Sequence, residues 1–255
     1  MNQNKRSILV ADDVSKYFGR MAAVKDLNFH VYDGEIFGIA GPNGAGKTTL
    51  FNVISHVFPP DSGQIKFKDE FIHKLSLDKI FKLGVARTFQ IPALFKTLTV
   101  RQNVQIGGTF GNPGKGAGMS KHNLDDLIDN TLKFTGLSKK SDVIAEELDL
   151  MDRKLLMIAS ALVTNPEVLM LDEPIAGLGK VDSDKVMELI RNINRKNITI
   201  LLIEHVMEAL MGLSNRVMIM HHGEKICEGD PAKVAKDEKV IEAYLGEEYI
   251  HHKKL

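Results

Sequence analysis

The stretch that most constrains this chain runs from Gly41 to Thr49, directly after an apolar run that ends at Ala40. The order predicts a strand, a tight loop and a helix that begins near Lys47. Glycines let the loop backbone curl so that successive N–H groups point at one anion, and the helix adds its positive end. Lys47 is spaced to reach the terminal phosphates of a nucleotide, and the Thr48 hydroxyl to bind magnesium. The predicted nucleoside triphosphate site is formed by Gly41, Pro42, Asn43, Gly44, Ala45, Gly46, Lys47, Thr48 and Thr49.

Composition suits one large domain or a core with a subdomain, and it does not favour nucleic-acid binding. The chain has 255 residues and is 44% hydrophobic, which is enough to bury a core. Lys and Arg number 33, as do Asp and Glu, so a broad basic surface for DNA or RNA is not expected. The single cysteine, Cys227, fits a reducing compartment. Ile8–Ala11 is too short for a signal-peptide core, and no run approaches the roughly 18 apolar residues of a spanning helix, so we expect membrane association only through a partner.

Short apolar runs separated by turn signals predict the order of strands and helices. Alternation from Ile8 to Val31 predicts strands, Asp33-Gly34 a tight turn, and the apolar positions of Thr49–Val57 a helix. Because strands and helices keep alternating through most of the chain, we expect a mostly parallel sheet. The last part predicts a hairpin around Gly223 and two short helices within Pro231–Leu245.

Residues 99–146 differ from the α/β pattern around them. A helix is predicted to start at Thr99, and a second, amphipathic helix covers Leu124–Phe134. Between them, residues 107–118 contain six glycines and a proline. Because glycine loses the most entropy on ordering, we expect this segment to be a loop without fixed structure. The whole region predicts an inserted helical subdomain.

Polar side chains follow the apolar strands of the predicted sheet. Val168–Leu171 is a run of four apolar residues, typical of a buried parallel strand, and Asp172 and Glu173 come directly after it. His205 follows a second strand and Gln90 a third. Because ligands of open α/β sheets bind beyond the carboxyl ends of the strands, we expect these side chains and the glycine loop to converge.

This set of residues suits hydrolysis of a β–γ phosphate bond, in which the protein mainly positions water and neutralises charge. We predict that Asp172 holds magnesium and that Glu173 polarises the attacking water, although Glu173 could also be a plain surface carboxylate. His205 would contact the γ-phosphate or orient Glu173. Gln90 would join Thr48 as a metal ligand, but alone it is equally consistent with a surface glutamine.

With these motifs in place, the chain resembles the nucleotide-binding subunits of ABC transporters over residues 7–247. The motifs come in the family's order: phosphate loop, Gln90, a signature region, the strand and acids at 168–173, and a final histidine. The resemblance implies an α/β fold with a P-loop NTPase core and mostly parallel sheet, an N-terminal antiparallel β subdomain and an inserted α-helical subdomain. It also implies that the ring of Phe18, or second that of Tyr17, stacks on adenine, although both rings would equally suit the cover of a sheet.

The resemblance further implies a single ABC ATPase domain over residues 1–255, with the helical subdomain at 91–165 and a short helical tail at 230–255. Within the family, segments such as 86–90 and 240–246 are similar to branched-chain amino acid importers. The ATPases of lipopolysaccharide export and of urea or amide uptake share much of this pattern and remain alternatives. A soluble ABC-type ATPase is a further alternative, although the single cassette lacks a coiled-coil insertion and a basic surplus.

One departure from the family concerns its signature, Leu-Ser-Gly-Gly-Gln, which falls here on Leu148-Asp149-Leu150-Met151-Asp152. A carboxylate replaces the serine hydroxyl that would donate to a γ-phosphate; it still caps the helix but repels phosphate. Either a different ATPase with an intact signature completes the site, which we slightly favour, or backbone N–H groups of this helix suffice.

The resemblance thus implies an ATP hydrolase, with ATP and Mg²⁺ as cofactors, that powers import of branched-chain or related amino acids. It implies membrane permease subunits and a second ATPase chain, in a homo- or heterodimer, as partners, and a periplasmic or extracellular binding protein that acts indirectly. The implied location is peripheral, on the cytoplasmic face of the cell membrane. The permease and the binding protein choose the substrate and direction, so this sequence does not contain them.

Overall fold

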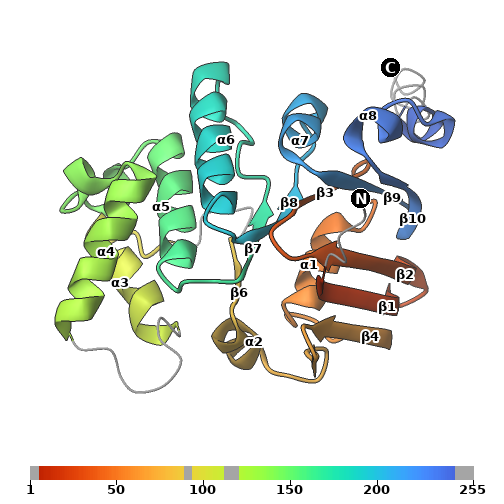
Figure 1. The fold of residues 1–255 in the computed structure, drawn as a ribbon, viewed down its shortest axis with the longest axis horizontal. Coiled ribbons are helices and arrows are strands. Elements are labelled where there is room, and N and C mark those ends of the chain that lie inside the picture. Colours follow the sequence, from red (N-terminus) through yellow and green to blue (C-terminus); the bar gives the residue numbers. More distant parts are fainter. Residues whose placement is uncertain (1–5, 89–93, 112–120, 245–255) are drawn as a thin grey trace. The chain divides into compact units, whose positions relative to one another are not determined.

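The computed structural model describes residues 6–88, 94–111 and 121–244. The chain divides into two compact units. The first unit combines residues 1–77 with 199–255, and residues 78–198 form the second. The chain therefore begins the first unit, builds the second, and returns to complete the first, as the colours of Figure 1 show.

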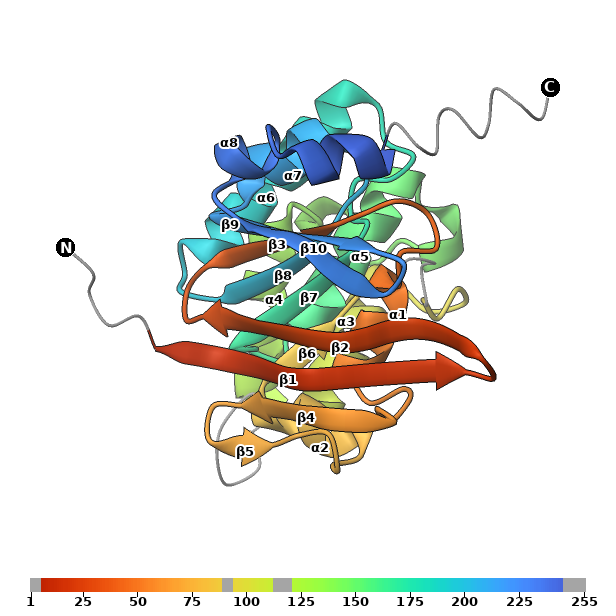
Figure 2. The ribbon, with the colours of Figure 1, turned by 90° about the vertical axis from the view of Figure 1, so that its right-hand side faces the viewer.

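An antiparallel sheet is formed in the described part of the first unit by β1 (Ser7–Phe18), β2 (Met21–Tyr32), β4 (Ser62–Phe67) and β5 (Glu70–Phe71). The strands lie in the order β2-β1-β4-β5 (Figure 2). β1 and β2 join at a tight turn in which Gly19 has φ +62°, and Phe18 pairs with Met21 across it. The strands predicted from Ile8 to Val31 are therefore confirmed, whereas β5 was not predicted.

A mostly parallel group of strands carries the glycine loop of the first unit. It comprises β3 (Ile36–Ala40), β8 (Thr199–Ile203), β9 (Arg216–His221) and β10 (Glu224–Gly229). β3 pairs in parallel with both β8 and β9, and β10 returns antiparallel to β9, which confirms the predicted hairpin. All five residues of β3 are buried, as expected for a parallel strand covered on both faces. The helices of this unit are α1 (Lys47–Ile54), the unpredicted α7 (Met207–Leu213), α8 (Pro231–Val234) and the helical residues 238–244.

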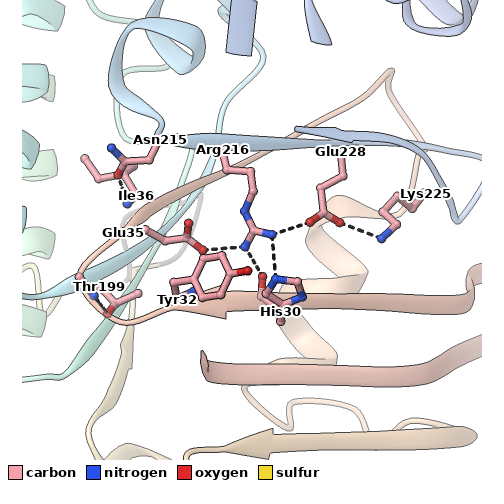
Figure 3. Close-up of polar contacts among 10 residues, drawn as sticks. His30, Tyr32, Glu35, Ile36, Thr199, Asn215, Arg216, Lys225 and Glu228 are labelled. Carbon is pink, nitrogen blue, oxygen red and sulfur yellow. Dashed lines mark hydrogen bonds and ion pairs between the residues drawn. The ribbon is translucent and has the colours of Figure 1, made fainter. Parts of the chain in front are cut away.

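Arg216, at the start of β9, ties β9 and β10 to the antiparallel sheet (Figure 3). Its guanidinium group pairs with Glu35 and with Glu228, each at 2.7 Å, and donates to the backbone carbonyl of His30 on β2. The ring centroid of Tyr32 lies 4.7 Å from the guanidinium carbon. The three charged side chains are at most 16% exposed; Arg216 supplies a counter-charge to both carboxylates, and Lys225 supplies a second one to Glu228 at 2.7 Å.

The second unit joins a pair of strands to a group of helices (Figure 1). Its elements are α2 (Leu77–Leu83), β6 (Val85–Arg87), α3 (Val100–Phe110), α4 (Lys121–Thr135), α5 (Leu150–Leu162), β7 (Val168–Asp172) and α6 (Lys180–Asn194), with 3₁₀ turns at Ser138–Lys140 and Ala145–Glu147. β6 and β7 are parallel, and every residue of β7 is buried, as predicted. On α6, Val186, Leu189, Ile190 and Ile193 are buried and form one apolar face.

The prediction of a loop over residues 107–118 is wrong in its first part, because α3 continues through Gly107 and Gly108. A Cβ atom on Gly107 would lie 2.3 Å from the carbonyl oxygen of Ser160 on α5. One on Gly108 would lie 2.7 Å from a methyl carbon of Leu124 on α4. Close packing of three helices therefore offsets the low helix propensity of glycine. Most of the rest of that segment lies outside the described residues.

Helix α5 begins at Leu150. The predicted cap is confirmed, because the Asp149 carboxylate accepts a hydrogen bond from the N–H of Asp152 at 2.8 Å. The helix begins directly after this cap, because the capping bond sets the first turn before the apolar periodicity starts.

The single domain over 1–255, the helical subdomain at 91–165 and the C-terminal tail at 230–255 stay predictions. Helices α3, α4 and α5 fall within the second of these ranges, and α8 falls within the third.

Candidate functional site

The glycine loop follows β3, and other backbone segments approach it closely. Gly46 has φ +100°, and a Cβ atom there would lie 2.1 Å from the carbonyl oxygen of Ala23 on β2. A Cβ atom on Gly41 would lie 2.1 Å from the carbonyl oxygen of Met220 on β9. A side chain at either position would displace a neighbouring strand, so these two sites require glycine.

Helix α1 presents its N-terminus and a lysine to the inside of this loop. Its N-cap is Gly46, which has no side chain to occupy the first N–H groups, and its first turn is free of acidic residues. Such an N-terminus fits an anion. Lys47 is 8% exposed, and its Nζ donates to the carbonyls of Gly41 at 2.5 Å and Pro42 at 2.9 Å. The ammonium group is thus held inside the curve, and the loop fits the phosphates of a nucleotide.

The turn between β9 and β10 holds the glycine loop in place through backbone hydrogen bonds. The sequence did not predict this contact. Gly223 donates its N–H to the carbonyl of Ala45 at 3.1 Å, and its own carbonyl accepts from the N–H of Lys25 at 2.9 Å. Because this contact depends on the pairing of β3 with β9, no local pattern around Gly223 could have revealed it.

Phe18 and Tyr17, the predicted adenine-stacking residues, lie at the end of β1 and are both 42% exposed. The Phe18 ring meets that of Phe58 edge-on, with centroids 5.6 Å apart. Asp61 fixes this end of the strand by accepting from the Tyr17 N–H at 2.6 Å and the Lys16 ammonium at 3.0 Å. The Tyr17 N–H, and after it Lys16, hold the pKa of Asp61 below its ordinary value. An aromatic surface is thus available in the same unit as the glycine loop.

His205 is exposed just after β8. Since β8 runs parallel to β3, with Ile39 opposite Ile203, His205 and the glycine loop follow the carboxyl ends of neighbouring strands, as predicted. Gln90 lies outside the described residues, so its role stays a prediction.

In the second unit, Asp172 ends β7 and is buried beside Arg87 of β6. Arg87 Nη2 donates to Asp172 Oδ2 at 3.0 Å, and the two side chains are 7% and 0% exposed. Burial lowers the pKa of Arg87, and the charge of Asp172 opposes that decrease. Sequence reasoning identified Asp172 but missed Arg87, because an arginine in a short strand carries no local sign of its partner.

Glu173 comes next, with its backbone in the left-handed region at φ +51°. This conformation is uncommon for residues other than glycine and persists where surrounding contacts hold it. Here Lys154 of α5, which is 7% exposed, donates from Nζ to the Glu173 carbonyl at 2.9 Å. The lysine thereby fixes the turn that carries the predicted base.

The Thr48 hydroxyl in the first unit and the Asp172 carboxylate in the second are each an oxygen donor of the kind that suits magnesium. This ion takes one or two carboxylates and completes its shell with phosphate oxygens and water. Within the described residues there is no group of three or more histidine, cysteine, aspartate or glutamate side chains that could hold a metal ion.

The N-terminus of α5 carries acidic groups and a lysine. Lys140 pairs with Asp152, and its Nζ lies 4.0 Å from the capping carboxylate of Asp149. Leu150, which takes the place of a signature glycine, is 43% exposed, and a Cβ atom on Gly177 would lie 3.2 Å from its side chain. The tip of this helix is therefore acidic and apolar.

A pocket of about 160 Å³ lies beside β6 and α5. The Ser160 hydroxyl, which lines it, is buried and has no hydrogen-bond partner in the part of the chain that the structure describes. The lining residues are Phe81, Arg87, Thr88, Leu94, Met157, Ser160 and Ala161.

A family model described as ABC transporter matches residues 24–176, which is more than half of the chain. The chain belongs to the ABC transporter family. A second model, described as branched-chain amino acid ATP-binding cassette transporter, matches residues 224–250 of this ABC chain.

Curated relatives align with nearly all of this ABC chain. The high-affinity branched-chain amino acid transport ATP-binding protein LivG of Escherichia coli (strain K12) is 36% identical over 250 residues, 94% of this chain and 98% of the relative. BraF of Pseudomonas aeruginosa, which has the same description, is 33% identical over 254 residues, 95% and 99% of the two chains. The probable LivG of Methanocaldococcus jannaschii is 33% identical over 253 residues, 94% and 98% of the two chains.

Solved structures of ABC cassettes have the same fold. A nucleotide-free ATP-binding cassette from an ABC transporter has a TM-score of 0.85 and 31% identity, over 94% of this chain and 99% of that one. The ADP conformation of an ABC transporter cassette has a TM-score of 0.86 and the same identity and coverage. The predicted ABC-type α/β fold is therefore confirmed, and the chain is an ATP-binding subunit of the ATP-hydrolysing class. None of the described helices is both long and apolar enough to cross a membrane.

Proposed function

We propose that this chain binds and hydrolyses ATP to power the import of branched-chain or related amino acids. The observation that carries the proposal is the glycine loop, in which Lys47 is held inside a curl that ends at an uncapped helix N-terminus. The match of residues 224–250 to branched-chain amino acid cassettes supports this substrate class over urea, amides and lipopolysaccharide. The descriptions of the curated relatives support it as well.

Nucleotide binding would use the first unit. Phe18, with Tyr17 second, would stack on adenine, and the backbone N–H groups of residues 41–49 would hold the phosphates. Lys47 would exchange its bonds to loop carbonyls for bonds to the terminal phosphates, which are stronger because both partners are charged.

For the chemical step we assign a role to each predicted residue. We assign Thr48, Gln90 and Asp172 to magnesium, which, when bound, neutralises part of the phosphate charge. Glu173 would accept a proton from the attacking water, and its backbone conformation, held by Lys154, would set the direction of its side chain. His205 would donate a hydrogen bond to the γ-phosphate.

The pocket beside β6 and α5 suits a segment of a permease subunit. Both apolar and polar side chains line it, and the buried Ser160 hydroxyl would gain a partner when the pocket is filled. Because that permease lies in the membrane and ATP is cytosolic, we place the chain on the cytoplasmic face of the cell membrane. A substrate-binding protein would act on the opposite side of the permease and would not touch this chain.

A second ATPase chain would complete the site, and we infer that its signature is intact. In this chain, the Asp149 carboxylate caps α5 where the family has a hydroxyl donor, and Leu150 adds an exposed side chain at the same tip. A negative charge at this point disfavours a γ-phosphate. The productive site would therefore combine this chain's glycine loop with the partner's signature helix.

Two substitutions test the assignment. Lys47→Ala should weaken ATP binding about tenfold or more, since a charge-assisted hydrogen bond contributes roughly 1.5–3 kcal/mol. Glu173→Gln should leave binding intact and reduce turnover about 10²-fold or more, because a general base contributes at least that factor. Binding is measured with a fluorescent ATP analogue, and turnover with the partner subunits present. Lys236→Ala, an exposed lysine of the same unit, is the matched control. Normal ATP binding by Lys47→Ala would refute the assignment of the loop.

A further inference from the structure

The side chain of Arg87 lies against the carboxylate that the proposed function assigns to magnesium. β6 and β7 pair so that Arg87 is opposite Met170, and the Thr88 N–H donates to the Met170 carbonyl at 2.9 Å. This register sets Arg87 beside the end of β7, where its Nη2 donates to Asp172 Oδ2 at 3.0 Å.

A carboxylate that is 0% exposed needs a counter-charge or strong hydrogen bonds to remain ionised. A guanidinium group stays protonated in proteins and offers a directional bond to carboxylate oxygen. Arg87 is therefore suited to hold the Asp172 carboxylate in one orientation when magnesium is not bound. The same positive charge, 3.0 Å from one carboxylate oxygen, opposes the approach of a second cation to that carboxylate.

We propose that Arg87 is a positioning residue, the resident counter-cation of Asp172, and that it suppresses binding of magnesium alone, so that the ion enters with the nucleotide. This inference rests on the proposed function, in which Asp172 receives the metal. The phosphates supply the additional negative charge that lets magnesium bind beside the arginine. Arg87 thereby makes occupancy of the metal site depend on the nucleotide.

Thermal unfolding in magnesium chloride without nucleotide tests the proposal. Arg87→Met should unfold about 5 °C or more below the unaltered chain in EDTA, because its buried carboxylate has lost a partner. Magnesium should then raise the unfolding temperature of Arg87→Met with a midpoint concentration at least tenfold lower than for the unaltered chain. Arg87→Lys, which keeps the charge, should behave like the unaltered chain.

Two further variants locate the effect. Asp172→Asn combined with Arg87→Met should abolish the magnesium-dependent shift, which assigns that shift to Asp172. Arg101→Met is the matched control, because Arg101 pairs with Asp125 and Asp129 in the same unit and is 29% exposed. It should show the magnesium response of the unaltered chain. If Arg87→Met does not fold, Arg87→Gln, which keeps a hydrogen-bond donor but no charge, carries the same test.

An equal magnesium response in Arg87→Met and the unaltered chain would overturn the inference, as would a shift that survives in the double variant. Binding of a fluorescent ATP analogue, with magnesium or with EDTA, separates this failure from failure of the proposed function. If Asp172→Asn binds the analogue with unchanged magnesium dependence, Asp172 is not a metal ligand and the proposed metal site is wrong. If Asp172→Asn loses that dependence while Arg87→Met responds to magnesium alone like the unaltered chain, only the role of Arg87 fails.

Discussion

Asp61 shows how one carboxylate positions a predicted binding ring. It lies after α1 in the chain, yet it accepts hydrogen bonds from the Tyr17 N–H and the Lys16 ammonium on β1. These bonds fix the strand end just before Phe18, and edge-on contact with Phe58 holds the ring itself. Loss of Asp61 should therefore affect both stability and the affinity for adenine.

The pKa of Asp61 gives this prediction a definite pH dependence. Because the Tyr17 N–H and Lys16 lower that pKa in the folded state, Asp61 stabilises the fold above the ordinary aspartate pKa of about 4. This contribution is lost as the pH falls through the lowered value. We expect the unfolding free energy of Asp61→Asn to lie below that of the unaltered chain at pH 7 and to converge with it toward about pH 2. Denaturant titrations at a series of pH values measure the difference, and Asp69→Asn, whose side chain is 95% exposed, is the control. A difference that stays constant down to pH 2 would contradict the prediction.

At the scale of elements, the glycines of α3 set how closely three helices of the second unit approach. Gly107 faces the carbonyl of Ser160, so a methyl group added there meets backbone that cannot give way easily. Gly212, in α7, has open space where its Cβ would be. These two helical glycines therefore make a matched pair.

We expect Gly107→Ala to destabilise the protein by about 1–3 kcal/mol through overpacking. Gly212→Ala should instead stabilise it by about 0.5–1 kcal/mol, because alanine has the higher helix propensity and meets no obstacle. Urea unfolding of both variants measures the two changes. Equal changes in the unfolding free energy of the two variants would contradict this expectation. They would show that helix propensity alone determines the effect of alanine and that the contact of α3 with α5 has no influence.

Where an element's signal is local, the sequence predicted it well. The buried strand β7 and the Asp149 cap each depend on side chains only a few residues apart, and both are confirmed. The course of α3 was missed, because Gly107 and Gly108 are helical only through contacts with α4 and α5. A high glycine content indicates a loop, except where a neighbouring element packs so closely that only glycine fits.

At the scale of the whole molecule, the acidic tip of α5 predicts how the ATPase chains pair. The Glu173→Gln chain alone, with ATP and magnesium, should stay monomeric, because Asp149 disfavours the phosphate of a second copy. The same chain with residues 149–152 changed to Ser-Gly-Gly-Gln should form an ATP-dependent dimer. Size-exclusion chromatography with light scattering measures both states. Robust cooperative ATP turnover by the unaltered chain alone would contradict this prediction.

The candidate site could be predicted as far as its motifs are contiguous. Lys47 and its glycine loop, Asp172 with Glu173, and His205 follow strands as the apolar runs indicate. The Arg87 pair, the contact of Gly223 with the loop, and the Arg216 cluster were not predicted. Each of these joins strands that are distant in sequence, and a single sequence carries no record of which strands become neighbours.

Insertion of the second unit into the first has a consequence for synthesis on the ribosome. The partners of β3 in its sheet are β8 and β9, and both lie beyond the roughly 120 residues of the second unit. About 160 residues separate the end of β3 from the start of β8, so at 5–20 residues per second β3 emerges on the order of 8–32 s before β8 and earlier still before β9. During that time the nascent chain carries a five-residue apolar strand whose backbone has no sheet partner. The backbone at Gly41 also lacks its close neighbour, the carbonyl group of Met220. The nucleotide loop can therefore take its final shape only after β8 and β9 have also been synthesised.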